Sequence, residues 1–128
     1  MDALIDTMPF ARRLGIEVVM ASRDEVRARL TWSEHLCTSG GVLHGGALMA
    51  LADTSGALCA FLNLPEGAAT STIESKTNFF RAVRDGHVET SSKPLHVGRS
   101  TIVVQTDLFD AAGKRVAHVT QTQAVLSA

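Results

Sequence analysis

The sequence has little of what marks several classes of protein. It contains no tyrosine and one tryptophan, and aromatic residues make up 5% of its 128 residues, so the composition gives no sign of a pocket for aryl groups. Basic residues are not in excess, because 12 Lys and Arg stand against 13 Asp and Glu. The chain lacks the broad positive field that holds a nucleic-acid backbone, so we expect no nucleic-acid partner.

Cysteines and metal-binding patterns are scarce as well. Cys37 and Cys59 form no CxxC pair, so we predict two reduced, buried thiols. The five histidines lack HExxH or any other tight ligand spacing, and Cys37 with His44 alone does not make a zinc site. We therefore expect no metal.

Targeting and membrane signals are also missing. The first six residues carry acid where a secretory signal carries base, and no small-residue cleavage site follows an apolar run, which favours a cytoplasmic protein. The longest apolar stretch, near residues 43–62, is interrupted by the polar segment 53–56 and is too short to span a membrane comfortably, so no membrane contact is expected. The length predicts a single domain over residues 1–128.

The residues near 43–62 leave almost no polar face, which predicts a long helix buried on all sides. Residues 63–67, with a proline and a glycine, then end this helix. A shorter amphipathic helix is predicted near residues 3–14, with Leu4, Ile5, Met8 and Leu14 on one side.

Strand-like alternation dominates the rest of the chain. Residues 25–33 place Val26, Ala28, Leu30 and Trp32 on one face, which predicts a half-exposed antiparallel strand that pairs with residues 15–21. Four further strands are predicted near residues 69–82, 86–97, 99–110 and 114–126, and Pro94 indicates an edge or a bulge in the second of these. One long helix followed by an antiparallel meander predicts an α+β domain in which the sheet wraps the helix.

A glycine-rich loop, Thr38–Gly46, runs directly into the long helix. The first turn of a helix has unpaired N–H donors and a partial positive charge, so it can hold a phosphate, a carboxylate or a developing oxyanion. Gly45 lets another group approach the backbone closely. The alternative is that these glycines only make a tight turn and allow close packing.

Asp53 is the only acidic or basic side chain between His44 and Glu66, apart from the weakly acidic thiol of Cys59, and it lies in the middle of the predicted buried helix. A buried carboxylate costs several kcal/mol unless it is paired or hydrogen-bonded. We therefore consider Asp53 a candidate general base or nucleophile. The alternatives are a carboxylate satisfied by Thr54, Ser55 or a neighbouring strand, and one exposed at a subunit seam.

The spacing of Gly45 and Asp53 constrains how they can cooperate. Eight residues correspond to roughly 12 Å along a helix axis, which is too far for both groups to act on one carbonyl. If they act together, they come from different chains. Two such helices antiparallel about a twofold axis would bring each Gly45 amide near the other subunit's Asp53 and give two equal sites per dimer.

Several motifs resemble one enzyme family. They are Gly41–Gly46 (GVLHGG) with Asp53 nine residues after the histidine, Asn78–Ala82 (NFFRA) with Gly86, Gly98–Ser100, and the Gly113–Lys114 hairpin. Over nearly its whole length the chain is similar to hotdog-fold acyl-CoA thioesterases of the phenylacetate-pathway and human acyl-CoA thioesterase-like branch. The resemblance implies a long central helix wrapped by a five- to six-stranded antiparallel sheet. It also implies hydrolysis of acyl-CoA to free acid and CoA, no cofactor beyond CoA as part of the substrate, and a homodimer as minimal unit that commonly pairs into a homotetramer.

The resemblance assigns roles residue by residue. The Gly45 amide would polarise the thioester carbonyl as an oxyanion hole, and Asp53 of the facing subunit would activate water or attack directly. His44 would help to place the thioester, and Thr72, with Ser71 as the alternative register, would hold the water. Thr38 stands where many relatives have Asn or Gln as a second carbonyl partner. The substrate-binding candidates are Gly46, Ser71, Lys93, Arg99, Ser100 and Phe79.

The stretch from Lys76 to Arg99 has a local positive excess that suits the phosphates of coenzyme A. Lys93 and Arg99 are the first candidates, and the alternative is that they are ordinary solvated charges. Large apolar residues are candidates for the acyl pocket, namely Met49, Phe61, Phe79 and Phe80.

Three other functions compete with this hypothesis. A hydratase or dehydratase of the same fold would carry a motif such as Asp-x-Asn-Pro-x-His, which is absent. A non-catalytic acyl-CoA-binding or regulatory module would keep the pocket and lose turnover. A purely structural oligomerisation domain would tolerate Asp53→Leu.

Overall fold

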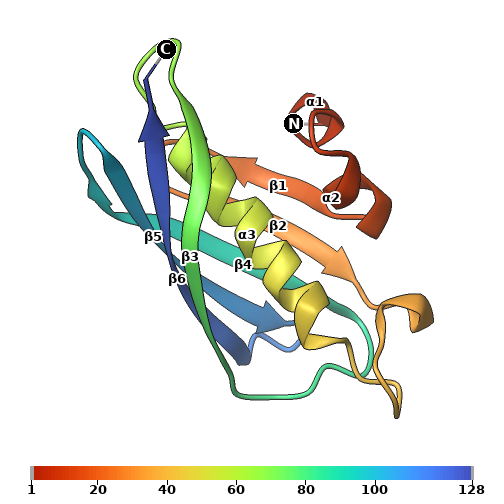
Figure 1. Cartoon of the computed structure of the whole chain (residues 1–128). Coiled ribbons are helices and arrows are strands. Elements are labelled where there is room, and N and C mark those ends of the chain that lie inside the picture. Colours follow the sequence, from red (N-terminus) through yellow and green to blue (C-terminus); the bar gives the residue numbers. More distant parts are fainter. Residues whose placement is uncertain (1, 128) are drawn as a thin grey trace.

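A computed structural model describes residues 2–127 as one helix-on-sheet domain (Figure 1). Two short helices, α1 (Asp2–Asp6) and α2 (Pro9–Leu14), precede the hairpin of β1 (Glu17–Ala21) and β2 (Val26–Thr31). A 3₁₀ turn, η1 (Glu34–Leu36), leads to the long helix α3 (Gly45–Phe61). The remaining strands are β3 (Ala69–Phe79), β4 (His87–Val97), β5 (Thr101–Asp110) and β6 (Arg115–Leu126).

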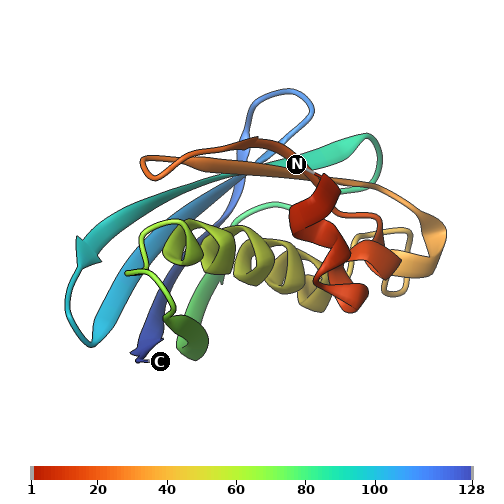
Figure 2. The ribbon, with the colours of Figure 1, turned by 90° about the horizontal axis from the view of Figure 1, so that it is seen from above.

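The six strands form one antiparallel sheet in the order β1-β2-β4-β5-β6-β3. The strands β3 and β1 lie at the two edges of the sheet. β3 follows α3 directly in the chain, yet its partner is the last strand, β6. The sheet curves around α3, which lies on its inner face (Figure 2). The predicted fold class, a long central helix wrapped by an antiparallel sheet, is confirmed.

The core forms where inward-facing strand positions meet α3. Val26, Ala28 and Leu30 of β2 are fully buried, and β5 contributes Ile102, Val104 and Leu108 from alternate positions. Trp32, predicted on the same face, lies just beyond β2 and is half-buried. Period-two alternation therefore located the inner face of both strands.

The helix α3 is not buried on all sides, contrary to the prediction. Gly46, Met49, Asp53 and Phe61 lie on a face that no element within residues 2–127 fully covers, and Met49 and Phe61 are 38% and 51% exposed. The composition of a helix shows that its faces are apolar, but it does not show whether the same chain supplies the cover. Nothing among the described helices is long and apolar enough to cross a membrane.

Among the smaller predictions, two need correction and one is confirmed. The predicted helix over residues 3–14 is broken into α1 and α2, because Pro9 begins a new helix and disfavours helical geometry in the residue before it. The prediction of an edge or a bulge at Pro94 is confirmed, because the register of β4 shifts between Pro94 and His96 and the pairing of β4 with β2 ends at Ser92. Cys37 is only half-buried, whereas Cys59 is buried as predicted.

Candidate active site

The loop before α3 ends in a helix cap made by His44. Gly40 and Gly41 have φ of 83° and 75°, a conformation that favours glycine, and they turn the chain toward the helix. His44 Nδ1 then accepts a hydrogen bond from the Gly46 amide at 2.7 Å, so the neutral ring carries its proton on Nε2. The Gly45 amide donates to no acceptor within residues 2–127 and is the free donor of this turn.

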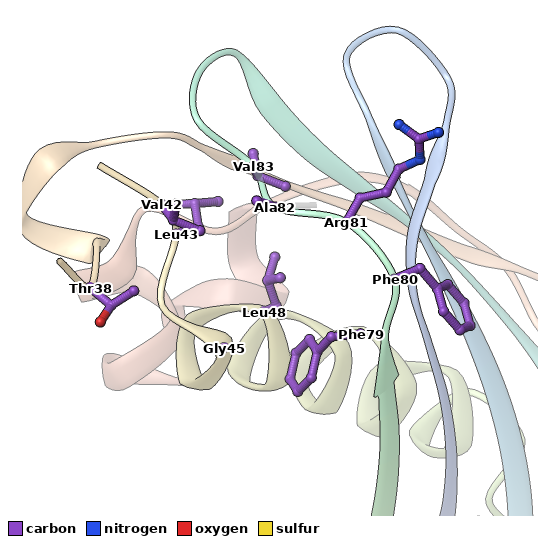
Figure 3. Close-up of a pocket in the computed structure, with 10 residues that line it drawn as sticks. All are labelled: Thr38, Val42, Leu43, Gly45, Leu48, Phe79, Phe80, Arg81, Ala82 and Val83. Carbon is purple, nitrogen blue, oxygen red and sulfur yellow. The ribbon is translucent and has the colours of Figure 1, made fainter. Parts of the chain in front are cut away.

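Gly45 opens onto a cleft of about 400 Å³, which we call the Gly45 cleft. Phe79 points toward the first turn of α3, whereas Phe80 and Arg81 point away from it (Figure 3). A Cβ at position 45 would come within 3.2 Å of Phe79 Cζ, so the absence of a side chain keeps the amide accessible. The lining residues are Thr38, Val42, Leu43, Gly45, Leu48, Phe79, Phe80, Arg81, Ala82 and Val83.

Asp53 lines a second cleft of about 400 Å³, the Asp53 cleft, together with Gly46, Met49, Ala50, Thr72 and Ser75. The α3 members recur at helical spacing, so they share one face of the helix beside β3. Asp53 Oδ1 accepts hydrogen bonds from Thr72 Oγ1 at 2.8 Å and from Gln121 Nε2 at 3.0 Å. Ser75 Oγ is buried and has no hydrogen-bond partner within residues 2–127.

Sequence reasoning missed Gln121 and Gln123, which lie on the inner face of β6. Both side chains are fully buried, and Gln123 Nε2 donates to Thr72 Oγ1 at 2.7 Å. The signal was present, because alternation along the predicted strand places them on the same face as Val119. Buried amides are uncommon and need partners, which makes such positions candidates for a polar site.

The structure brings some of the predicted site residues together and leaves others apart. Thr38, Gly45 and Phe79 meet in one cleft, and Gly46, Asp53 and Thr72 meet in the other. Gly45 and Asp53 are separated along α3 and line different clefts, so a single chain does not join the amide to the carboxylate.

The remaining candidates lie away from both clefts in the single chain. Ser71 is exposed and points to the opposite side of β3 from Thr72. Lys93 is exposed on the outer face of β4, across the sheet from α3. Arg99 and Ser100 form the exposed β4–β5 turn, which the Ser100 carbonyl joins to β6 by accepting from the Val125 amide at 2.9 Å. Within residues 2–127, no three His, Cys, Asp or Glu side chains converge on a point that could hold a metal.

With this geometry in place, the comparisons with known proteins identify the family. Residues 40–117, which span the helix cap, α3 with Asp53, strands β3 to β5 and the start of β6, match the model of the thioesterase superfamily. The chain belongs to the thioesterase superfamily. Its hotdog fold and its resemblance to hotdog thioesterases are thus confirmed, and thioester hydrolysis is supported as its general activity.

Individual relatives agree with this assignment. The chain is 32% identical over 102 residues to the proofreading thioesterase EntH of Cronobacter turicensis, covering 80% of this chain and 74% of that protein. It superposes on a Haemophilus influenzae thioesterase with a TM-score of 0.89 and 31% identity, covering 92% and 82% of the two chains. A mutant thioesterase from Pseudomonas aeruginosa gives a TM-score of 0.92 at 25% identity, with 98% and 92% covered.

Proposed function

We propose that this thioesterase-superfamily chain hydrolyses acyl-CoA thioesters as a homodimer whose two sites each combine residues from both subunits. Asp53 of one subunit activates water, or attacks directly, and the Gly45 amide of the facing subunit holds the oxygen of the thioester carbonyl. One observation carries the proposal. The free Gly45 amide at the start of α3 and the half-buried Asp53 carboxylate lie apart on the same helix, and that helix has a face that its own chain leaves uncovered.

The chemistry of thioester hydrolysis fits these two groups. Negative charge develops on the carbonyl oxygen, and a preorganised N–H donor typically contributes about 10² to 10³-fold to the rate. Water must become nucleophilic, and a positioned base contributes about 10² to 10⁴-fold. The thiolate leaves with little help because thiols are fairly acidic. No cofactor or metal is needed in this scheme.

A second copy of the chain has a surface to cover. The edge strand β3 carries Ile73, which is 61% exposed, next to the uncovered face of α3 with Met49 and Phe61. An unpaired edge strand beside exposed apolar side chains favours association with another chain. A twofold axis near this edge would run two α3 helices antiparallel and bring each Gly45 cleft to the other subunit's Asp53 cleft.

Mixed dimers test whether the site is shared. Asp53→Asn removes the base, and Gly45→Ala places a methyl group beside Phe79 and hinders approach to the amide. Each variant alone should be nearly inactive in an assay of thiol release from short, medium, aryl and hydroxyaryl acyl-CoAs. When both are co-expressed, each heterodimer should keep one intact site, which restores about a quarter of the wild-type sites under random pairing.

The outcome distinguishes the competing functions. If both groups acted within one chain, every site of the heterodimer would carry a defect and mixing would restore nothing. If wild-type protein binds acyl-CoA but releases no thiol from any acyl-CoA of the panel, it is a non-catalytic binding module instead. Light scattering on the same samples gives the number of chains per particle.

A further inference from the structure

The two carboxylate oxygens of Asp53 have different surroundings. Oδ1 accepts from Thr72 Oγ1 and Gln121 Nε2, at 2.8 and 3.0 Å. Oδ2 accepts from no group within residues 2–127, although the side chain lines the Asp53 cleft. One oxygen is therefore bonded to the sheet, and the other is left for a ligand or a water molecule.

The donors to Oδ1 are themselves fixed by β6. Thr72 accepts from Gln123 Nε2 at 2.7 Å, so its single hydroxyl proton is directed to Asp53. The single hydroxyl proton of Thr70 lies between two acceptors, Gln123 Oε1 at 3.0 Å and the Ala124 carbonyl at 2.8 Å. From Gln123 Nε2 through Thr72 Oγ1 the donor direction is consistent, and it ends on the Asp53 carboxylate.

Gln121 is retained at a cost to the fold. A carboxylate only accepts hydrogen bonds, so the amide NH₂ must face Asp53, and Gln121 Oε1 is then buried without a partner. Gly56 leaves room for this carbonyl, because a Cβ there would collide with Oε1. A buried acceptor without a partner is destabilising, and an apolar side chain of similar size would avoid it.

We infer that Gln121 is a positioning residue, which holds Asp53 through Oδ1 and so presents Oδ2 to the Asp53 cleft. This inference rests on the proposed catalytic role of Asp53. Without Gln121, Thr72 alone would hold the carboxylate, which could then rotate about its side-chain bonds. The reacting oxygen would leave its productive position, whereas substrate contacts elsewhere would not change.

The test is a double-mutant cycle between Gln121 and Asp53. Gln121→Met keeps the length and removes the donor and the unpartnered carbonyl. We expect kcat for acyl-CoA hydrolysis to fall between about 10-fold and 10²-fold, with KM changed by less than about twofold and an unchanged or raised Tm. In the Asp53→Asn background, Gln121→Met should lower the residual rate no further, because it acts through the carboxylate.

A matched control lies on the other side of α3. Thr106→Val alters a buried hydroxyl on β5 that does not touch Asp53, so it should lower Tm and leave kcat unchanged. If Gln121→Met does not fold, Gln121→Leu provides the second variant.

The outcomes separate the two hypotheses. A Gln121→Met enzyme with normal kcat beside an inactive Asp53→Asn enzyme would overturn the positioning role alone. So would equal losses from Gln121→Met in both backgrounds, which indicate a general structural defect. Full turnover by Asp53→Asn would overturn the proposed function and the positioning role together.

Discussion

Two clusters of polar side chains flank α3, and they differ in charge and in whether a buried polar atom is left without a partner. The hydroxyl cluster comprises Ser55, Thr90, Ser92 and Thr106, all of them buried and linked by contacts of 2.6 to 2.7 Å. The carboxylate cluster comprises Asp53, Thr72, Gln121 and Gln123. Positions 53 and 55 point to nearly opposite sides of one helix, so the comparison keeps the scaffold constant.

The hydroxyl cluster is neutral and every member has a partner inside it, and Thr90 also accepts from the Ala28 amide at 2.9 Å. The carboxylate cluster holds the charge of Asp53, the unpartnered Gln121 Oε1 and an oxygen open to a cleft. Satisfied buried networks rigidify a core, whereas charge and unsatisfied groups at a cleft cost stability and need another explanation. The difference suggests a division of roles: one side of α3 fixes the helix on the sheet, and the other holds the carboxylate that the proposed function makes the reactive group.

The strongest test of this contrast is Asp53→Asn, which removes the charge and keeps the shape. We expect thioester hydrolysis to fall by at least about 10²-fold, because the base is lost. The fold should remain, and the free energy of unfolding should change little. Steady-state kinetics and denaturant unfolding on the same preparation check this. Near-normal turnover would remove Asp53 from the mechanism and leave two merely structural clusters.

Sequence patterns predicted the fold because they report local periodicity. The alternation of Val26, Ala28 and Leu30 located an inner face, and the apolar run around Asp53 located the long helix. The position of β3 at the sheet edge beside β6 was beyond such reasoning, because strand order depends on contacts between distant segments. The same limit applied to the uncovered face of α3.

The candidate site was predicted in part for the same reason. Gly45 and Asp53 follow from the glycine-rich loop and the isolated acid, whereas Thr72 was only implied by the family resemblance. The register that places Thr72 rather than Ser71 against Asp53 depends on β3 pairing and on a bulge after Thr72. Alternation places Gln121 and Gln123 on the inner face of their strand, but no spacing in the sequence indicates which residues they bond to. Only the packing of β6 on α3 brings Gln121 to Asp53.

Gly56→Ala tests how tightly the carboxylate cluster is packed. The new Cβ would collide with Gln121 Oε1 and displace the donor to Asp53, so kcat should fall up to about 10²-fold, as for Gln121→Met. Overpacking costs about 1 to 3 kcal/mol, and the gain in helix propensity offsets about 1 kcal/mol of it. Combining Gly56→Ala with Gln121→Ala should restore stability but not kcat. An active Gly56→Ala enzyme would show that Gln121 can move freely.

Ser55→Ala makes the opposite change, in the hydroxyl cluster. Thr90 and Ser92 lose their shared partner, so the free energy of unfolding should fall by about 1 to 3 kcal/mol. The rate of thioester hydrolysis below the unfolding transition should stay within about twofold of wild type. Urea unfolding and kinetics measure the two quantities. A large loss of kcat without a loss of stability would contradict the division between the clusters.

Cys59 is a third polar group on α3, beside the hydroxyl and carboxylate clusters, and it is buried among apolar side chains. It gives the smallest expected effect, a change in the free energy of unfolding with pH. Desolvation raises the pKa of its thiol from 9.0 to about 11, so the folded protein keeps the neutral form that an apolar site favours. Below pH 9 both folded and unfolded chains hold this proton. Above it the unfolded chain loses the proton first, so the contribution of Cys59 to the free energy of unfolding should fall by about 1.4 kcal/mol at pH 10.

The comparison with Cys59→Ala isolates this effect from other groups that titrate in the same range. The difference in unfolding free energy between wild type and variant should shrink by about 1.4 kcal/mol from pH 8 to pH 10. A constant difference would mean that water reaches the thiol in the folded state. A shrinking one would show that α3 keeps an ionisable group neutral where it gives no donors.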